Sequence, residues 1–425
     1  MKVAVIGAGW AGCAAAVEAT RLSHQVTLFE AARIPGGRAR RVDGQWPDGS
    51  ALPLDNGQHI LIGAYSATLQ LMADLGLDAN ALLHRMPLTL QFPDGSGLRF
   101  PSLPTPLDAF VGILRARGWS WRDKASLLLA ATRWQLAGFR CAPELSVADL
   151  CITLTPAVLT TLIEPLCVAA LNTPADRASG QVFLRVLRDA LFSQSGGSNL
   201  LLPRTDLSAL LPDAALAWLA QHGADVRLGS RVLALASVGS GWQVDGETFE
   251  RVILACPPGE AARLALSSNL PCDAWVAQAS ALQFEAITTV YVSSPGTRLA
   301  QPMLTLRASE TEGDAPAQFV FDRGQLGGPD GLLAFVVSAS QGDSAALTQR
   351  VLLQARQQLG LRQAVAVQTI VEKRATFACL PGLLRPAEQL LPGLLACGDY
   401  VNGPYPATLE GAVRSGLQAA QIAIK

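Results

Sequence analysis

Apolar and polar positions in the first thirty residues predict a strand, a helix and a second strand in that order. Residues 3–6 form a short β-branched run of the kind found in buried parallel strands. Residues 13–22 are rich in alanine and predict a helix, and residues 25–30 predict the second strand. The glycine-rich turn at residues 7–12 separates the first strand from the helix. This βαβ pattern predicts a Rossmann-like α/β domain.

Later segments show other periodicities. Residues 81–195 have a helical pattern, whereas residues 261–385 contain short β-like runs, such as 332–338, with one amphipathic helix over 344–359. Near the end, a strand over 394–397 and a helix over 409–424 repeat the opening pattern. We therefore expect an α/β protein with a discontinuous Rossmann-like domain, a helical cap and a substrate domain built on an antiparallel or mixed sheet. The expected ranges are 1–80, 196–260 and 386–425 for the first, 81–195 for the cap and 261–385 for the substrate domain.

The composition of the chain argues against several classes of function. The chain has 425 residues and a formal net charge of −1, which gives no basic surface for a nucleic acid. Its eight cysteines form no C-x-x-C pair and no Cys/His cluster with metal spacing, so we expect reduced thiols and no metal. No uninterrupted apolar run reaches the length of a transmembrane helix. We expect a cytoplasmic protein, and the positive mean hydropathy favours an apolar substrate or a membrane surface.

The opening turn, Gly7-x-Gly9-x-x-Gly12, predicts a dinucleotide site. Gly7 permits the tight turn, Gly9 lets a pyrophosphate approach the backbone, and Gly12 allows close helix packing. Glu30 ends the second strand, where its carboxylate can accept hydrogen bonds from a ribose. Ala8, Ala11 and Ala31 are the neighbouring residues expected to contact the cofactor.

The following segment favours FAD over NAD. Gly36-Gly37-Arg38 brings a flexible backbone and a guanidinium fork to a phosphate. Near the C-terminus, Gly398-Asp399 follows a strand, so that Asp399 can bind a ribityl hydroxyl or a phosphate-bound water. The N–H groups at Thr408 and Leu409 open a helix, which suits an anionic edge of a flavin.

These motifs together resemble the FAD-dependent amine oxidase and phytoene desaturase superfamily. Within it, "LDNGQHILIGAY", "EPLCVAALNTP" and "PATLEGAVRSG" are similar to the hydroxysqualene dehydroxylases, over essentially the whole chain. The resemblance implies non-covalent FAD and a long apolar isoprenoid substrate, as in squalene and hopanoid biosynthesis. It also implies that Gly57, Gln58 and His59 lie along the flavin ring and that the Val232 backbone meets the adenine.

The implied reaction is the reductive dehydroxylation of hydroxysqualene by hydride transfer. The leaving hydroxyl needs a proton, and the candidate acids are His59, Tyr405, Asp55 and Glu164; a purely supporting role for His59 stays open. Alternatives are a carotenoid-type desaturase, another amine-oxidase-type flavoenzyme, or a non-enzymatic isoprenoid escort. An aromatic cage for amine oxidation is not evident, and no separate nicotinamide site is visible, so the electron donor is unknown.

Residues 106–140 combine three tryptophans, several leucines and six basic residues with only two acids. Such a mixture is typical of helices that lie in a membrane interface, and it is equally typical of a cap with a solvated basic face. The first alternative predicts a peripheral enzyme at the inner face of the membrane.

Overall fold

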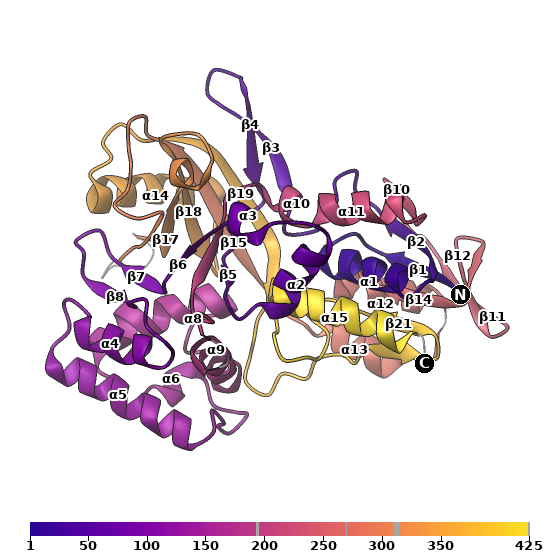
Figure 1. The fold of residues 1–425 in the computed structure, drawn as a ribbon, viewed down its shortest axis with the longest axis horizontal. Helices are drawn as coiled ribbons and strands as arrows, with labels where there is room; N and C mark the ends of the chain where they lie inside the picture. The colour runs from indigo at the N-terminus through magenta and orange to yellow at the C-terminus, as the bar shows by residue number, and fades with distance from the viewer. Residues whose placement is uncertain (193–194, 269, 309–314, 424–425) are drawn as a thin grey trace.

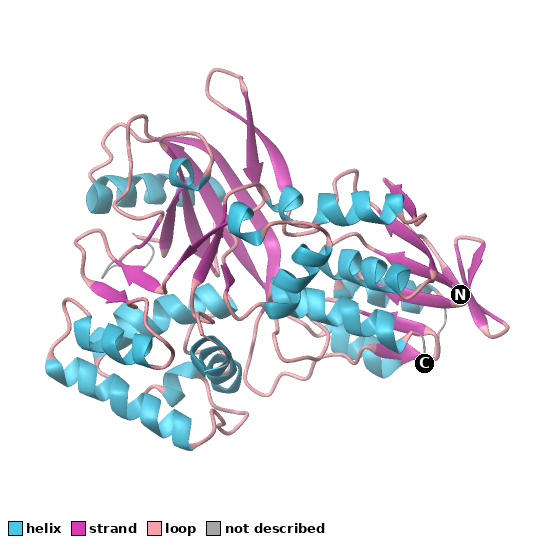
Figure 2. Cartoon of the chain, in the orientation of Figure 1, coloured by secondary structure: helices cyan, strands magenta, loops and turns pink. Residues whose placement is uncertain are grey.

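The computed structural model describes residues 1–192, 195–268, 270–308 and 315–423, and its elements form three regions (Figure 1). One region holds a mostly parallel sheet with α1 and α15, a second holds an antiparallel sheet with α14, and a third holds the helices α4 to α9. Figure 2 shows the same division between sheets and helices. The boundaries of independently folding domains stay a prediction.

The six-stranded sheet combines distant parts of the chain. Its order is β10 (Asp225–Leu228), β2 (Gln25–Glu30), β1 (Lys2–Ile6), β14 (Arg251–Leu254), β21 (Leu394–Ala396) and β20 (Gln389–Leu391). The first five strands are parallel, and β20 is antiparallel to β21. The prediction of a Rossmann-like fold assembled from separate segments is therefore confirmed.

Two helices from opposite ends of the chain pack together against this sheet. α1 (Trp10–Arg21) contacts α15 (Leu409–Ile422) so closely that a Cβ at Gly416 would lie 2.1 Å from the Ala11 carbonyl oxygen. α1 begins three residues before the expected Cys13, because Gly9 already has the extended backbone of an N-cap. Ile424, the expected end of the last helix, lies outside the described residues.

The antiparallel sheet has the order β16 (Met303–Thr305), β17 (Phe319–Asp322), β18 (Leu332–Ser338), β15 (Phe284–Ser293) and β19 (Val365–Phe377). α14 (Ser344–Leu359) packs against β19 and β15 and has the predicted boundaries. The predicted antiparallel pairing is confirmed. β19 was not predicted, because charged residues interrupt its apolar pattern.

The expectation of a wholly helical segment at 81–195 is wrong for its first part. The segment contains β6 (Leu83–Met86) and a hairpin of β7 (Thr89–Gln91) and β8 (Gly97–Arg99). The hairpin turns at Gly95, whose φ of +78° suits glycine. β6 exists because it pairs with β9 (Leu200–Pro203), which is more than a hundred residues away, so the local pattern could not reveal it.

The helical region follows these strands. It comprises α4 (Leu107–Arg115), α5 (Trp121–Leu136), α6 (Val147–Leu150), α7 (Pro156–Val158), the π-helical turn η1 (Leu159–Ile163), α8 (Glu164–Leu171) and α9 (Gly180–Phe192). Asn172 connects the region to the antiparallel sheet, since its amide donates to Thr376 Oγ1 at 3.0 Å and its oxygen accepts from Ala339 N at 2.7 Å. The helices are thereby held over one side of that sheet.

Smaller elements complete the described chain. They are β3 (Arg41–Gln45), β4 (Ala51–Asp55), β5 (Leu61–Ile62), α2 (Ser66–Asp74), α3 (Ala79–Leu82), α10 (Leu207–Leu210), α11 (Pro212–Gln221), β11 (Leu235–Val238), β12 (Gly241–Val244), β13 (Glu247–Phe249), α12 (Pro258–Ser267), α13 (Asp273–Ser280) and the 3-10 turn η2 (Arg323–Leu326). All eight cysteines are free thiols, and seven are buried. Among the described residues no helix has the length and apolar character needed to cross a membrane.

Candidate cofactor and substrate site

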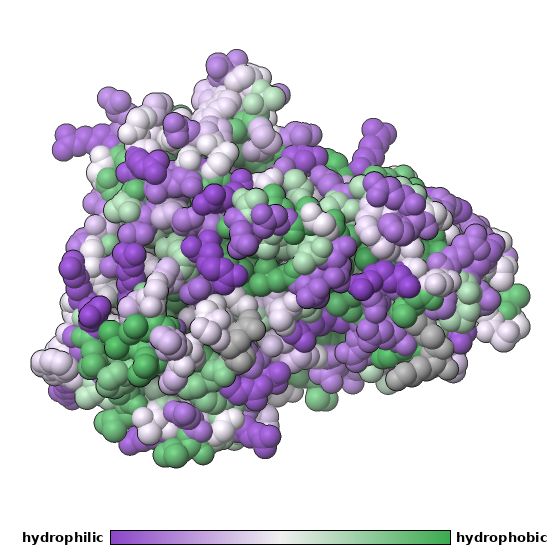
Figure 3. Space-filling model, in the orientation of Figure 1, coloured by the Kyte–Doolittle hydropathy of each residue, from purple (hydrophilic) through white to green (hydrophobic). Residues whose placement is uncertain are grey.

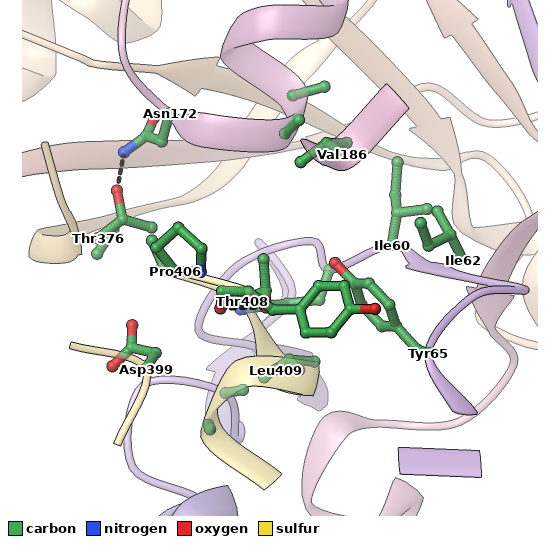
Figure 4. A pocket seen from close by; sticks show the side chains of 18 of the residues that line it. Ile60, Ile62, Tyr65, Asn172, Val186, Thr376, Asp399, Pro406, Thr408 and Leu409 are labelled. Carbon is green, nitrogen blue, oxygen red and sulfur yellow. Dashed lines mark hydrogen bonds between the residues drawn. The ribbon is translucent and has the colours of Figure 1, made fainter. Parts of the chain in front are cut away.

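A cavity of about 1370 Å³ extends from the glycine-rich turn after β1 into the helical region. This volume exceeds the range of about 300–1,000 Å³ that is usual for a single small-ligand pocket. Figure 4 shows Thr408 and Leu409 at the start of α15, with Val186 of α9 across the cavity and Ile60 and Ile62 beside it. The cavity therefore has room for a dinucleotide together with a second, apolar molecule.

The glycine-rich turn leaves the first turn of α1 open to the cavity. Gly7 has a φ of +113°, and a Cβ on it would lie 2.7 Å from the Ala255 carbonyl oxygen. A Cβ on Gly9 would meet only Gly37 Cα at 3.9 Å, so there is free space beside it. The first turn of α1 has no side-chain cap, and its N–H groups are available to an anion.

Not every residue of the motif reaches the cavity. Gly12 packs inside, where a Cβ would lie 1.8 Å from the Gly7 carbonyl oxygen, and Ala8 is fully buried. Neither is among the lining residues, whereas Gly7, Gly9 and Ala11 are. Gly12 and Ala8 thus shape the turn from behind.

Glu30 lines the same end of the cavity, together with Ala31. Its two carboxylate oxygens accept from Ala8 N and Ala32 N, each at 2.7 Å. These bonds orient the carboxylate at the end of β2, beside the turn that precedes α1. Such a placement leaves further lone pairs on the carboxylate for hydroxyl donors.

Two predicted cofactor segments meet through an ion pair. The Arg38 guanidinium pairs with the Asp399 carboxylate and also donates to the Ala375 carbonyl oxygen at 2.8 Å. Gly36, Gly37, Arg38, Gly398 and Asp399 all line the cavity. The structure therefore brings the Gly-Gly-Arg and Gly-Asp motifs together, although Arg38 and Asp399 are more than 350 positions apart.

Of the residues at the end of β4 and just after it, some line the cavity and one points into the protein interior. Gly57, Gln58 and His59 line the cavity, whereas Asp55 does not. The Asp55 carboxylate accepts from Leu207 N at 2.8 Å and so fixes the start of α10. Burial raises the pKa of Asp55 to about 6. Asp55 is thus not brought to the site.

His59 is a partly buried imidazole at the cavity wall. Its Nδ1 lies 3.4 Å from the Gly57 carbonyl oxygen, and burial lowers the pKa of the ring to about 4. At pH 7 only about one ring in a thousand would carry the second proton. His59 therefore lines the cavity as a neutral imidazole, which is a poor source of protons.

Another part of the cavity wall is built around the start of α15. Thr408 caps the helix by accepting from Gly411 N at 2.9 Å, and its hydroxyl donates to the Tyr405 carbonyl oxygen at 2.9 Å. A Cβ on Gly411 would lie 1.9 Å from that same carbonyl oxygen. The helix and the preceding loop are therefore locked together, so that Thr408 and Leu409 face the cavity.

Tyr405 also lines the cavity, next to Asp189 of α9. The phenol donates to the Asp189 carboxylate, and Arg185 and Arg414 lie 5.8 Å and 5.0 Å from the ring centroid. Burial and the Asp189 carboxylate raise the pKa of Tyr405 above its usual range, so the phenol stays protonated at neutral pH. Sequence reasoning missed Asp189, because nothing local distinguishes it from a surface residue of a helix.

Glu164, the fourth candidate acid, is exposed at the start of α8 and is not among the lining residues. Val232 does line the cavity, and its carbonyl oxygen accepts from Arg263 Nη2 at 3.1 Å. Arg263 in turn pairs with Glu260 at 2.8 Å, and all three residues lie at the same end of the cavity. Sequence reasoning found Val232 and missed the other two.

The lining fits FAD. The uncapped start of α1 and the free space at Gly9 suit a pyrophosphate, and Glu30 suits a ribose. Near the Gly-Asp turn, the buried Tyr400 hydroxyl has no hydrogen-bond partner among the described residues, and Tyr400 lines the cavity. A buried polar group without a partner is costly, which is explained if a bound molecule completes the site.

The part of the cavity within the helical region is apolar. Its walls come from α4, α5, η1, α8, α9 and the segments that follow β8 and α5. They include Phe100, Ile113, Leu127, Trp134, Phe139, Leu162, Leu166, Val186 and Leu187. Such a surface binds hydrocarbon by the hydrophobic effect and offers few hydrogen bonds to a polar ligand.

Known proteins match the chain over most of its length. A family model described as flavin-containing amine oxidoreductase matches residues 10–424. A hydroxysqualene dehydroxylase of Rhodopseudomonas palustris is 28% identical over 463 residues, which cover 99% of this chain and 98% of that protein. A zeta-carotene desaturase of Zea mays is 33% identical over 129 residues, which cover only 29% of this chain and 22% of the relative.

Proteins of known structure have the same fold as this chain. An oxidoreductase from Methanosarcina mazei superimposes with a TM-score of 0.74 at 16% identity, over 99% of this chain and all of the other. At this identity the likeness is one of fold alone.

Proposed function

Because the chain belongs to the flavin-containing amine oxidoreductase family, and is therefore an FAD-dependent oxidoreductase, we propose that it removes the hydroxyl group of a long isoprenoid alcohol by reduction. The substrate proposed is hydroxysqualene and the product squalene. The observation that carries this proposal is the match to a hydroxysqualene dehydroxylase over nearly the full length of both chains. The carotene desaturase match spans less than a third of the chain and does not favour desaturation.

The cavity supports a substrate of this class. A single space joins the cofactor end, lined by Glu30 and Arg38, to the apolar walls between α5 and α9. A long hydrocarbon chain can occupy the apolar part while its hydroxyl-bearing carbon lies near Thr408 and Leu409. Burial of that chain gives binding energy without specific polar contacts.

The reaction balances as an alcohol plus a proton plus a hydride giving a hydrocarbon and water. The reduced flavin supplies the hydride when it is bound. The protein must supply the proton, because hydroxide is a poor leaving group. Tyr405 fits this part better than His59, since its phenol keeps its proton at neutral pH whereas His59 is neutral imidazole.

An anaerobic single turnover tests the activity. The flavin-loaded protein is reduced and mixed with hydroxysqualene, while flavin absorbance and products are followed together. We expect the flavin to be reoxidised as an equal amount of squalene forms. Oxidised protein that is instead reduced by a polyene precursor, and reduced protein inert to hydroxysqualene, would show that the enzyme is a desaturase.

Two variants separate the candidate proton donors. Tyr405→Phe removes the phenol hydroxyl and should slow the single turnover by about 10²–10⁴-fold, the usual contribution of a general acid, while FAD stays bound. His59→Asn keeps a polar side chain at the wall and should slow it much less. The opposite order of the two rates would assign the proton to His59.

We further propose that the enzyme docks on the inner face of a membrane through α4 and α5. Leu107 and Phe110 of α4 are exposed and also line the cavity, as do Thr132 and Gln135 of α5. Figure 3 shows a hydrophobic patch over the part of the molecule where Figure 1 places these helices. A cavity that opens beside an exposed apolar surface would let a water-insoluble isoprenoid enter directly from the bilayer.

A further inference from the structure

A second pocket of about 260 Å³ lies beside the main cavity, between α9, the end of α5 and the loop that precedes α15. Four arginines line it: Arg140, Arg185, Arg188 and Arg385. Phe139 and Pro406 line both this pocket and the main cavity. In Figure 1, α9 lies at the border between the helical region and the start of α15.

The four arginines carry more positive charge than the neighbouring carboxylates neutralise. One carboxylate, Asp189, pairs with both Arg185 and Arg188, at 2.7 Å and 3.1 Å. Arg140 and Arg385 have no carboxylate partner among the residues the structure describes. The Arg385 guanidinium donates to the carbonyl oxygens of Val401 and Gly403 instead.

Several like charges around a small concave surface repel one another unless an anion joins them. Burial lowers the pKa of Arg385, so its charge costs free energy that a bound anion would recover. Guanidinium groups present paired N–H donors that match the oxygens of a phosphate. The chemistry of the pocket is therefore that of a phosphate site.

We propose that Arg140, Arg185, Arg188 and Arg385 bind a phosphate or diphosphate group. The pocket is smaller than the usual range of about 300–1,000 Å³ for a whole small ligand, so it takes only the phosphate part of a larger molecule. The pocket would bind this group whichever alcohol the enzyme reduces. The phosphate group can come from two sources: a soluble dinucleotide that reduces the flavin, or the headgroup of a phospholipid beside α5.

Calorimetric titration of the flavin-loaded protein with inorganic pyrophosphate tests the site. At low ionic strength we expect a single saturable site whose affinity falls as salt is added. Arg140→Gln should weaken it about tenfold, and Arg140→Gln with Arg188→Gln by a further factor of about ten, since each removes a charge-assisted hydrogen bond. Arg133→Gln, which removes an exposed arginine of α5 outside the pocket, should leave the affinity unchanged.

The single Arg140→Gln variant keeps the test valid if the double variant loses flavin. Competition distinguishes the sources. If pyrophosphate releases the protein from vesicles containing phosphatidylglycerol, the site binds lipid headgroups; if pyrophosphate binds and vesicle attachment is unaffected, its natural ligand is soluble. Absence of saturable pyrophosphate binding, or equal affinity in the Arg140 and Arg133 variants, overturns the proposal.

Discussion

Glu30 holds two backbone N–H groups and faces the space expected for the ribose of FAD. Glu30→Ala removes a charged acceptor whose hydrogen bonds are each worth roughly 1.5–3 kcal/mol. We expect FAD affinity to fall by about ten- to a hundredfold, with the fold retained. Fluorescence titration of apoprotein with FAD measures this loss, and circular dichroism checks the fold.

Glu30→Gln is the matched control, since it keeps one carbonyl oxygen and the length of the side chain. It should lose less affinity than the alanine variant. An unchanged dissociation constant in both variants would mean that the carboxylate only supports the turn after β1.

The sequence predicts those site residues whose positions are set by the local chain. Gly7, Gly9 and Glu30 could be predicted because a strand, a turn and a helix place them at fixed spacing. Asp189, Arg263 and Tyr400 could not, because each reaches the cavity only through tertiary packing. Asp55 and Glu164 show the converse: a carboxylate near a motif is not thereby at the site.

One side of α5 exposes apolar side chains to solvent. Trp121, Leu129 and Leu136 are 74%, 60% and 84% exposed, and their spacing places them on one side of the helix. Trp119 and Trp134 are only 8% exposed, so they belong to the core and not to a membrane surface. The proposed apolar contact with a bilayer therefore rests on one tryptophan and on leucines, not on three tryptophans.

Trp121→Gln combined with Leu136→Gln should reduce co-sedimentation with anionic vesicles by at least tenfold, because each side chain would lose about 1.5–3 kcal/mol of burial. Replacing Arg115, Arg117, Arg122 and Lys124 by glutamine should remove most of the salt-sensitive part, about 1 kcal/mol for each basic residue. Leu353→Gln, at an exposed position of α14, is the control. If all these variants sediment to the same extent as the unmodified protein, α5 is a solvated part of the cap.

Elements with a strong local period were predicted well, and those defined by partners were not. α14 and β18 have the expected boundaries, because a helical stripe and a continuous apolar run are visible in the sequence. β6 and β19 exist through pairing with distant strands, and the consecutive charges Glu372, Lys373 and Arg374 interrupt the apolar pattern of β19. The local sequence of such strands therefore does not clearly predict a β-strand.

For the whole molecule, we expect FAD to be held without a covalent bond. Cys256 and Cys397 line the cavity, but burial raises the pKa of the Cys256 thiol to about 12 and that of Cys397 further still. Attack on a flavin would need the thiolate, which these groups do not form at neutral pH. Acid precipitation should release all the yellow colour into the supernatant. A yellow pellet would contradict this expectation.

The contact between α1 and α15 also has a consequence for how the protein is made. During synthesis the N-terminal strand and glycine-rich turn leave the ribosome first, but Gly398, Asp399 and α15 follow nearly four hundred residues later. Pairing of segments so far apart is slow, and unpaired apolar strands are exposed to aggregation in the meantime. We therefore expect the nascent chain to acquire flavin only after translation ends, and to depend on chaperones until then.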